Sequence, residues 1–217
     1  ALEGAQIRHG MRGAVGAIER VSIDDDVKCA TIGNAPAIGI CGSGLVDAVA
    51  AMLSAGVLKS SGLLKADVGG GLADKLKKRF TKTEDNKEQF VLVWADESGR
   101  DEDIVLTQHD IRQLQLAKGA IVSGVMMLQN VMDVPDEKLK ELMLCGGFGN
   151  YISTESAVKI KLLPNLELDS ITYLGNAAHL GAQMALLSEL ERDRAQKIAS
   201  EVQHVALAMH PDFQNIF

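Results

Sequence analysis

Two glycine-rich turns are the parts of this sequence whose residue types are best suited to chemistry. The first ends in Gly42, Ser43 and Gly44, and the second ends in Gly146, Gly147, Phe148, Gly149 and Asn150. Each follows an apolar run that predicts a strand and precedes a pattern that predicts a helix. Backbone N–H groups at the start of a helix stabilise anionic phosphates, and glycine lets such a group approach the main chain closely. The two turns therefore predict contacts with a nucleotide.

Each turn by itself carries a weak signal. Neither contains the lysine of the Walker pattern or the full dinucleotide fingerprint. A single turn of this kind is equally compatible with a tight strand-to-helix connection that contacts no ligand. Two such turns in one α/β segment favour a nucleotide over that simpler interpretation.

A predicted helix rich in small residues lies beyond the second turn. Its small side chains are Ala177, Ala178, Gly181 and Ala182, which allow close packing against a neighbouring element. Plain helix packing is the simplest explanation of this pattern. The functional alternative is a hinge helix between two lobes, which slides as the lobes close.

Lys118 is the single side chain that we add to the candidate nucleotide contacts. It lies with Arg112 on the polar side of a long predicted helix, from which both side chains reach either a bound nucleotide or solvent. Cys145 follows three apolar positions and is predicted to be a core thiol.

No catalytic residue is predicted. Glu3 and Asp47 are the carboxylates near the glycine turns, and they form no obvious acid–base pair. Ser43 lacks the surroundings of a catalytic nucleophile. The five histidines show no spacing typical of metal ligands, so no metal site is predicted.

The elements that must position these residues alternate between strands and helices. Strands are predicted at 18–23, 27–32, 37–40, 90–94, 104–106, 142–145, 171–174 and 205–207. Helices are predicted at 45–53, 107–132, from 154 to before Pro164, 176–190 and 192–202. The segment 69–71 is predicted to turn, and 75–88 to face solvent. Strands that alternate with helices after residue 100 indicate α/β layering.

The longest predicted helix covers 107–132. Thr107 and Asp110 at its start resemble a capping box. Two apolar stripes then leave its second half apolar on most sides, which is typical of a helix buried between layers.

Composition excludes several classes of function. The net charge is −7, and the longest basic run, Lys77–Arg79, is predicted to be a solvated helix face. Nucleic acid is therefore not expected as a partner, and no apolar run is long enough to predict a membrane span. The 3 cysteines include no C-x-x-C pair, which argues against a disulfide framework, a zinc site or an iron–sulfur site in this chain. Unpaired thiols indicate a reducing cytoplasm.

Several strings in the sequence together resemble one family. They are 1–12 (ALEGAQIRHGMR), 39–47 (GICGSGLVD), 116–118 (LAK), 146–151 (GGFGNY), 175–178 (GNAA) and 210–214 (HPDFQ). The family is that of the reductive activators of corrinoid proteins, which are ATPases of the acetate/sugar kinase–Hsp70–actin superfamily. The similarity extends from Ala1 to Phe217 in the same order.

This resemblance implies a fold and a function. The expected fold is an α/β, ribonuclease-H-like lobe of the actin/Hsp70 type, with a mixed sheet flanked by helices. The expected function is ATP-dependent reduction of a corrinoid protein from Co(II) to Co(I). Gly146–Asn150 match the adenosine-binding loop of the superfamily, and Gly175–Ala182 match its second connecting helix. Gly42–Gly44 match a glycine turn near the nucleotide in related dehydratase activators.

The resemblance also implies that residues 1–217 are the C-terminal part of a longer ATPase. Both phosphate motifs, the Mg²⁺ ligands and a [2Fe–2S] domain are expected before Ala1. We therefore expect this chain to supply the adenosine side of the nucleotide site and to have no ATPase activity by itself. The expected partner is a corrinoid protein, and a homodimer is compatible with this prediction. His179 and Leu180 depart from the small residues expected in the connecting helix.

Two alternatives stay open at this point. One is another member of the same superfamily, such as a dehydratase activator or a small-molecule kinase. The other is a non-catalytic, actin-like binding module that recognises a partner protein. Plant-type ferredoxin cysteines in the parent polypeptide would favour the activator, a substrate-binding insertion the kinase, and loss of the phosphate-motif carboxylates the binding module.

Overall fold

The computed structural model describes residues 1–217 except 1, 3, 5, 67–70, 148–150, 165 and 211–212, and at 208, 214 and 215 it describes the backbone alone. The chain forms two compact units. The first unit comprises Ala1–Ala120 and Ile152–Leu163, and the second comprises Ile121–Tyr151 and Pro164–Phe217. The turn predicted at 69–71 lies largely outside the described residues.

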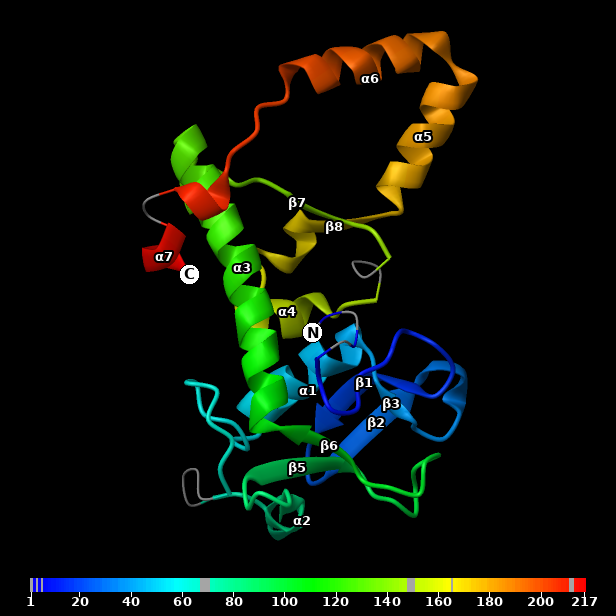
Figure 1. Cartoon of the computed structure of the whole chain (residues 1–217), viewed down its shortest axis with the longest axis vertical. Helices are drawn as coiled ribbons and strands as arrows, with labels where there is room; N and C mark the ends of the chain where they lie inside the picture. The colour runs from blue at the N-terminus through cyan, green and yellow to red at the C-terminus, as the bar shows by residue number, and fades with distance from the viewer. Residues whose placement is uncertain are drawn as a thin grey trace. The chain divides into compact units, whose positions relative to one another are not determined.

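The first sheet of the first unit is built around a β-hairpin. Strand β1 (Ala17–Ile23) pairs antiparallel with β2 (Val27–Thr31) and parallel with β3 (Gly39–Ile40), so the order is β2-β1-β3. A short 3₁₀ turn, η1 (Ile32–Asn34), follows β2. Helix α1 (Gly42–Ser54) begins directly after β3 and packs on β1 (Figure 1). The predicted hairpin and helix are confirmed.

The contact between α1 and β1 is very close. A Cβ atom added to Gly44 would lie 2.0 Å from the carbonyl oxygen of Ile18. Only glycine lets the first turn of α1 approach the strand this closely. Of the apolar residues of α1 at helical spacing, Leu45, Val46, Val49 and Met52 are buried.

The second sheet of the first unit is an antiparallel meander. It consists of β4 (Phe80–Lys82), β5 (Glu88–Val93) and β6 (Ile104–Thr107) in that order, and the short helix α2 (Asp74–Lys78) precedes it. Strand β5 is buried along almost its whole length. The two strands predicted near 90–94 and 104–106 are therefore confirmed, and β4 was missed because its three residues carry no apolar alternation.

Arg79 corrects the prediction that the basic cluster 77–79 faces solvent. Its side chain is 6% exposed, pairs with Asp26 and donates hydrogen bonds to the carbonyl oxygens of Val91 and Leu92 at 3.2 Å. The Arg79 guanidinium lowers the pKa of the Asp26 carboxyl, chiefly through their hydrogen bond. Because Asp26 precedes β2 and Arg79 precedes β4, this ion pair joins the two sheets. Sequence spacing does not show such a long-range partner.

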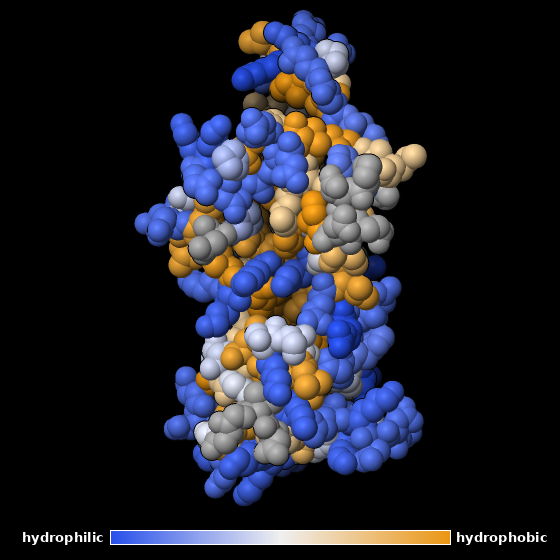
Figure 2. All heavy atoms as spheres, turned by 90° about the vertical axis from the view of Figure 1, so that its left-hand side faces the viewer, coloured by the Kyte–Doolittle hydropathy of each residue, from blue (hydrophilic) through white to orange (hydrophobic). Residues whose placement is uncertain are grey.

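Helix α3 (Gln108–Met132) confirms the predicted capping box. The Thr107 N–H donates to Asp110 Oδ2 at 2.8 Å, and the Asp110 N–H donates to Thr107 Oγ1 at 3.2 Å. The prediction that the second half is buried is wrong, since Ile121, Leu128 and other large apolar side chains there are exposed. Apolar surface is visible on the face shown in Figure 2. The pattern predicts which faces are apolar but not which faces are covered.

The second unit contains a parallel strand pair. Strand β7 (Leu142–Cys145) pairs with β8 (Ile171–Gly175), and the 3₁₀ turns η2 (Asp136–Lys138) and η3 (Leu168–Ser170) precede them. Both strands are confirmed. Cys145 is exposed, however, so the prediction of a buried strand with a core thiol is wrong. Four apolar residues in a row did not distinguish a covered strand from an uncovered one.

Both helices predicted after β8 are confirmed, with a different boundary between them. Helix α5 (Ala177–Leu187) ends three residues before the predicted 190, and α6 (Glu189–Glu201) begins at once. The reason is Ser188, which caps α6 by accepting a hydrogen bond from the Glu191 N–H at 3.3 Å. No described residue of α5 is buried, so the close packing predicted from its small residues is absent here.

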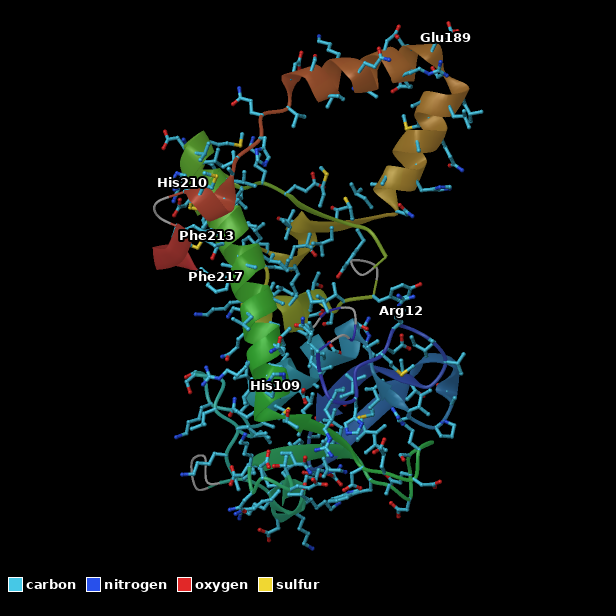
Figure 3. All side chains as sticks on the ribbon, in the orientation of Figure 1. Arg12, His109, Glu189, His210, Phe213 and Phe217 are labelled. Atoms are coloured by element: carbon cyan, nitrogen blue, oxygen red, sulfur yellow. The ribbon has the colours of Figure 1, made fainter. Side chains whose placement is uncertain are left out.

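The end of the chain is helical. The strand predicted at 205–207 is wrong, because 205–206 have no regular structure and the 3₁₀ turn η4 (Leu207–Met209) begins at Leu207. The short helix α7 (Phe213–Ile216) follows. The rings of Phe213 and Phe217 lie 5.8 Å apart (Figure 3). None of the described helices combines the length and hydrophobicity that a membrane span requires.

The close contact at Gly44 generates a stability prediction. We expect Gly44→Ala to lower the free energy of unfolding by about 1–3 kcal/mol, because the new methyl group overlaps the backbone of Ile18. Gly181→Ala is the matched control, since nothing lies within 4 Å of a Cβ there and alanine favours the helix. Urea unfolding followed by circular dichroism measures both. Equal midpoints for Gly44→Ala and the parent chain would contradict the packing account.

Candidate nucleotide site

The structure places the first predicted turn inside the first unit. Gly42, Ser43 and Gly44 form the first turn of α1 and are buried. The close backbone approach that glycine permits at Gly44 is made by Ile18 of the same chain. Protein packing therefore accounts for this glycine, and a nucleotide contact at residues 42–44 stays a prediction.

The second predicted turn is more open. Gly146 has a φ of +93°, which favours glycine, and among the described residues no atom lies within 4 Å of a Cβ built on Gly146 or Gly147. Phe148, Gly149 and Asn150 lie outside the described residues. The open space beside Gly146 and Gly147 is suited to a ligand that approaches the main chain.

This loop lies at the carboxyl end of the parallel pair. Cys145 at the end of β7 is in register with Gly175 at the end of β8, and the Gly146 N–H donates to the Gly175 carbonyl oxygen at 2.7 Å. Asn176 then caps α5 by accepting a hydrogen bond from the His179 N–H at 3.0 Å. The carboxyl ends of parallel strands are where open α/β sheets bind ligands. The predicted adenosine loop and the start of the predicted connecting helix are thus brought together.

A cavity that sequence analysis missed lies in the first unit. Its volume is about 280 Å³, and it lies between α1, the end of β1 and α4 (Thr154–Lys159). Helix α1 contributes Asp47, Ala50, Ala51 and Ser54, at the i, i+3, i+4 and i+7 positions of one helix face. The side chains of the two alanines are short, so they leave space in the cavity. From α4 come Glu155, Ser156 and Lys159.

Asp47 is the buried polar group of this cavity. It is 6% exposed, and its Oδ2 accepts a long hydrogen bond from the Val21 N–H at 3.4 Å. Arg20 Nη1 lies 3.8 Å from the same oxygen. The other oxygen, Oδ1, is buried without a hydrogen-bond partner. A buried acceptor in this state is costly unless a donor reaches it, and a ligand hydroxyl or amino group in the cavity supplies one.

The sequence contained part of the signal for this cavity. Asp47 stood out as a carboxylate near a glycine turn, and its helical spacing to Ala50, Ala51 and Ser54 defines a face of small and polar residues. What spacing does not show is that α4, more than 100 residues away in the sequence, closes the other side.

Lys118 lies in a different cavity of the first unit. It faces Val49 and Leu53 of the C-terminal half of α1, together with Lys159 and Lys161 at the end of α4. Burial lowers the pKa of Lys118, and the nearby charge of Lys161 lowers it further. Its assignment to a nucleotide stays a prediction. No cluster of three potential metal ligands occurs among the residues that the structure describes.

Comparisons with known proteins cover the whole chain. Residues 1–217 match the family described as the C-terminal domain of RACo, the ASKHA domain. The corrinoid activation enzyme RamQ of Eubacterium limosum is 39% identical over 215 residues, which cover 98% of this chain and 36% of that protein. A solved structure of a reductive activator for corrinoid, iron-sulfur protein matches with a TM-score of 0.87 and 39% identity, over 99% of this chain and 33% of the other. The chain therefore spans about a third of the length of these relatives.

The unpaired oxygen of Asp47 generates a binding prediction. We expect Asp47→Asn in the intact protein to weaken ADP binding about tenfold, because a charge-assisted hydrogen bond becomes a neutral one. The fold is retained, since asparagine keeps an oxygen for the Val21 N–H. Asp85→Asn, at an exposed position, is the control. Isothermal titration calorimetry measures the ADP affinity of each protein. If both variants and the parent protein bind ADP equally well, this cavity is not part of the site.

Proposed function

The chain belongs to the family of C-terminal ASKHA domains of RACo, and from this premise we propose that it supplies the adenosine side of the nucleotide site of an ATP-dependent corrinoid activator. The intact protein then reduces a partner corrinoid protein from Co(II) to Co(I). The observation that carries this proposal is the match of the whole chain to the corrinoid activation enzyme and to the reductive activator. The confirmed ASKHA fold is consistent with a nucleotide as the energy source.

Each unit, taken by itself, has one feature that supports a nucleotide contact. The loop at Gly146 and Gly147 has open space beside its main chain at the carboxyl end of β7. Asp47 Oδ1 is a buried acceptor without a donor, and it lines the cavity formed by α1 and α4. A nucleoside offers ribose hydroxyls and an amino group as donors for such an oxygen. In this proposal these groups bind and orient a ligand.

The cofactors and the partner belong to the intact protein in this proposal. Mg²⁺ and ATP provide the energy, and a [2Fe–2S] cluster elsewhere in the polypeptide delivers the electron that reduces cobalt. The partner is a corrinoid protein in the cytoplasm. The relatives are about three times as long as this chain, which leaves ample room for these further parts.

A hydrogen bond connects the start of the loop to the end of β8, just before α5. The Gly146 N–H donates to the Gly175 carbonyl oxygen, and Asn176 caps α5 immediately after it. A nucleotide that occupies the loop therefore acts on residues adjacent to the start of α5. We propose that this bond couples nucleotide occupancy to the orientation of α5, and that the differential affinity of ATP for two orientations drives the change.

The open space at Gly147 makes it a clean test of the loop. We expect Gly147→Asp in the intact protein to weaken ATP binding at least tenfold, because a carboxylate would repel the phosphates and occupy the ligand's space. The fold is expected to persist, since no described atom lies within 4 Å of the new Cβ. Gln203→Glu, which introduces a carboxylate at an exposed position of the second unit, is the control. An unchanged ATP affinity in a folded Gly147→Asp protein means that the loop is not part of the site.

The activity itself is tested by anaerobic absorption spectroscopy. We expect the intact protein, with an electron donor and a partner corrinoid protein, to convert the Co(II) spectrum to that of Co(I) only when ATP is present. The physical reason is that the Co(II)/Co(I) couple is too negative for ordinary reductants, so a coupled step is required. Equal rates with and without ATP would refute the activator function and favour another superfamily activity, such as a kinase.

A further inference from the structure

A second cavity in the first unit is lined by different residues of α1, Val49 and Leu53. Its volume is about 380 Å³, which is within the range of small-molecule sites. Leu53 of α1 and Ile111 of α3 contribute to an apolar wall. Three lysines also line this cavity: Lys118 of α3, Lys159 at the end of α4, and Lys161 two residues beyond it. The two cavities share Lys159 among their lining residues.

The three lysines carry charge without compensation. The residues that line this cavity in the described part of the chain include no aspartate or glutamate. No ion pair of Lys118, Lys159 or Lys161 occurs among the described residues, whereas Lys28 and Lys77 are paired with Asp24 and Asp74. The charge of Lys161 also acts on Lys118 and lowers its pKa, in addition to the effect of burial. Like charges gathered at a partly apolar cavity are unfavourable unless an anion joins them.

The backbone conformation at Lys161 is also unusual. Helix α4 ends in a Schellman motif, in which the Leu162 N–H donates to the Ala157 carbonyl oxygen at 2.8 Å. Lys161 occupies the left-handed position of this motif, with a φ of +58°. Glycine is preferred at this position because it has no Cβ. The chain instead has a lysine there, although the left-handed conformation is strained for a residue with a Cβ and although Lys118 carries the same charge nearby.

We propose that this cavity binds a small organic phosphate at a site separate from the nucleotide site. A phosphate monoester carries a charge of about −1.5 to −2 near neutral pH, so it compensates three lysines better than a carboxylate of charge −1 does. Lysine is a common phosphate ligand that acts as a point charge. The apolar wall accommodates the organic part of the ligand. The site depends on the first unit alone and not on the assignment of the glycine loop.

Phenyl phosphate is a suitable probe, because it combines both chemical features. We expect calorimetric titration of the intact protein to show tighter binding of phenyl phosphate than of either inorganic phosphate or benzoate. Lys118→Gln and Lys161→Gly are each expected to weaken phenyl phosphate about tenfold. Lys82→Gln, an exposed lysine outside the cavity, serves as the control and should leave the affinity unchanged.

Lys161→Gly also separates a structural role from a binding role. Glycine relieves the left-handed backbone, so we expect the unfolding midpoint to stay the same or rise while the phosphate affinity falls. Phenyl phosphate that binds the parent, Lys118→Gln and Lys161→Gly proteins equally would overturn the proposal.

Two further experiments test whether this phosphate site is separate from the nucleotide site. Saturating ATP should leave phenyl phosphate binding unchanged, and so should Asp47→Asn, because both act at the other cavity. Competition between ATP and phenyl phosphate would overturn the separate site and assign the lysines to the nucleotide. Failure of ATP to bind at all would instead count against the proposed function, without affecting the titration with phenyl phosphate.

Discussion

The close contact of α1 with the backbone of β1 is the constraint on which the first unit depends. Gly44 brings the helix against Ile18, where a Cβ would meet the carbonyl oxygen at 2.0 Å, and the Cys41 N–H donates to the same oxygen at 3.2 Å. One turn later, Asp47 accepts a hydrogen bond from the Val21 N–H. These contacts therefore fix both the distance of α1 from β1 and the rotation of α1 about its own axis. Its rotation decides which residues line each cavity, with Asp47 in one and Leu53 in the other.

Local sequence signals predicted most elements because each has a local physical cause. The capping box of Thr107 and Asp110 set the start of α3, and the acidic turn after Ile23 set the hairpin. Non-local facts were not predictable in this way. The burial of Arg79 depends on Asp26, 53 residues away, and the cavity at Asp47 depends on α4. Apolar runs also predicted burial at Cys145 and in the second half of α3, where the structure leaves the side chains exposed.

The candidate site was predicted in part. The glycine loop at Gly146 and Gly147 has the open main chain expected of a ligand-binding turn, whereas Gly44 is explained by packing against Ile18. A glycine that serves packing and a glycine that admits a ligand look alike in sequence, because both positions require only the absence of a Cβ. The resemblance to corrinoid activators was confirmed over the whole chain, and it carries the functional conclusion further than any single motif.

The central claim is that nucleotide binds at the loop after β7, and hydrogen exchange on the intact protein tests it most directly. Exchange is measured with and without a non-hydrolysable ATP analogue, at a concentration shown by titration to saturate the protein. Nucleotide binding at this loop predicts slower exchange in peptides that contain Gly146 and Gly147. Unchanged exchange in these peptides at saturating nucleotide would contradict the claim.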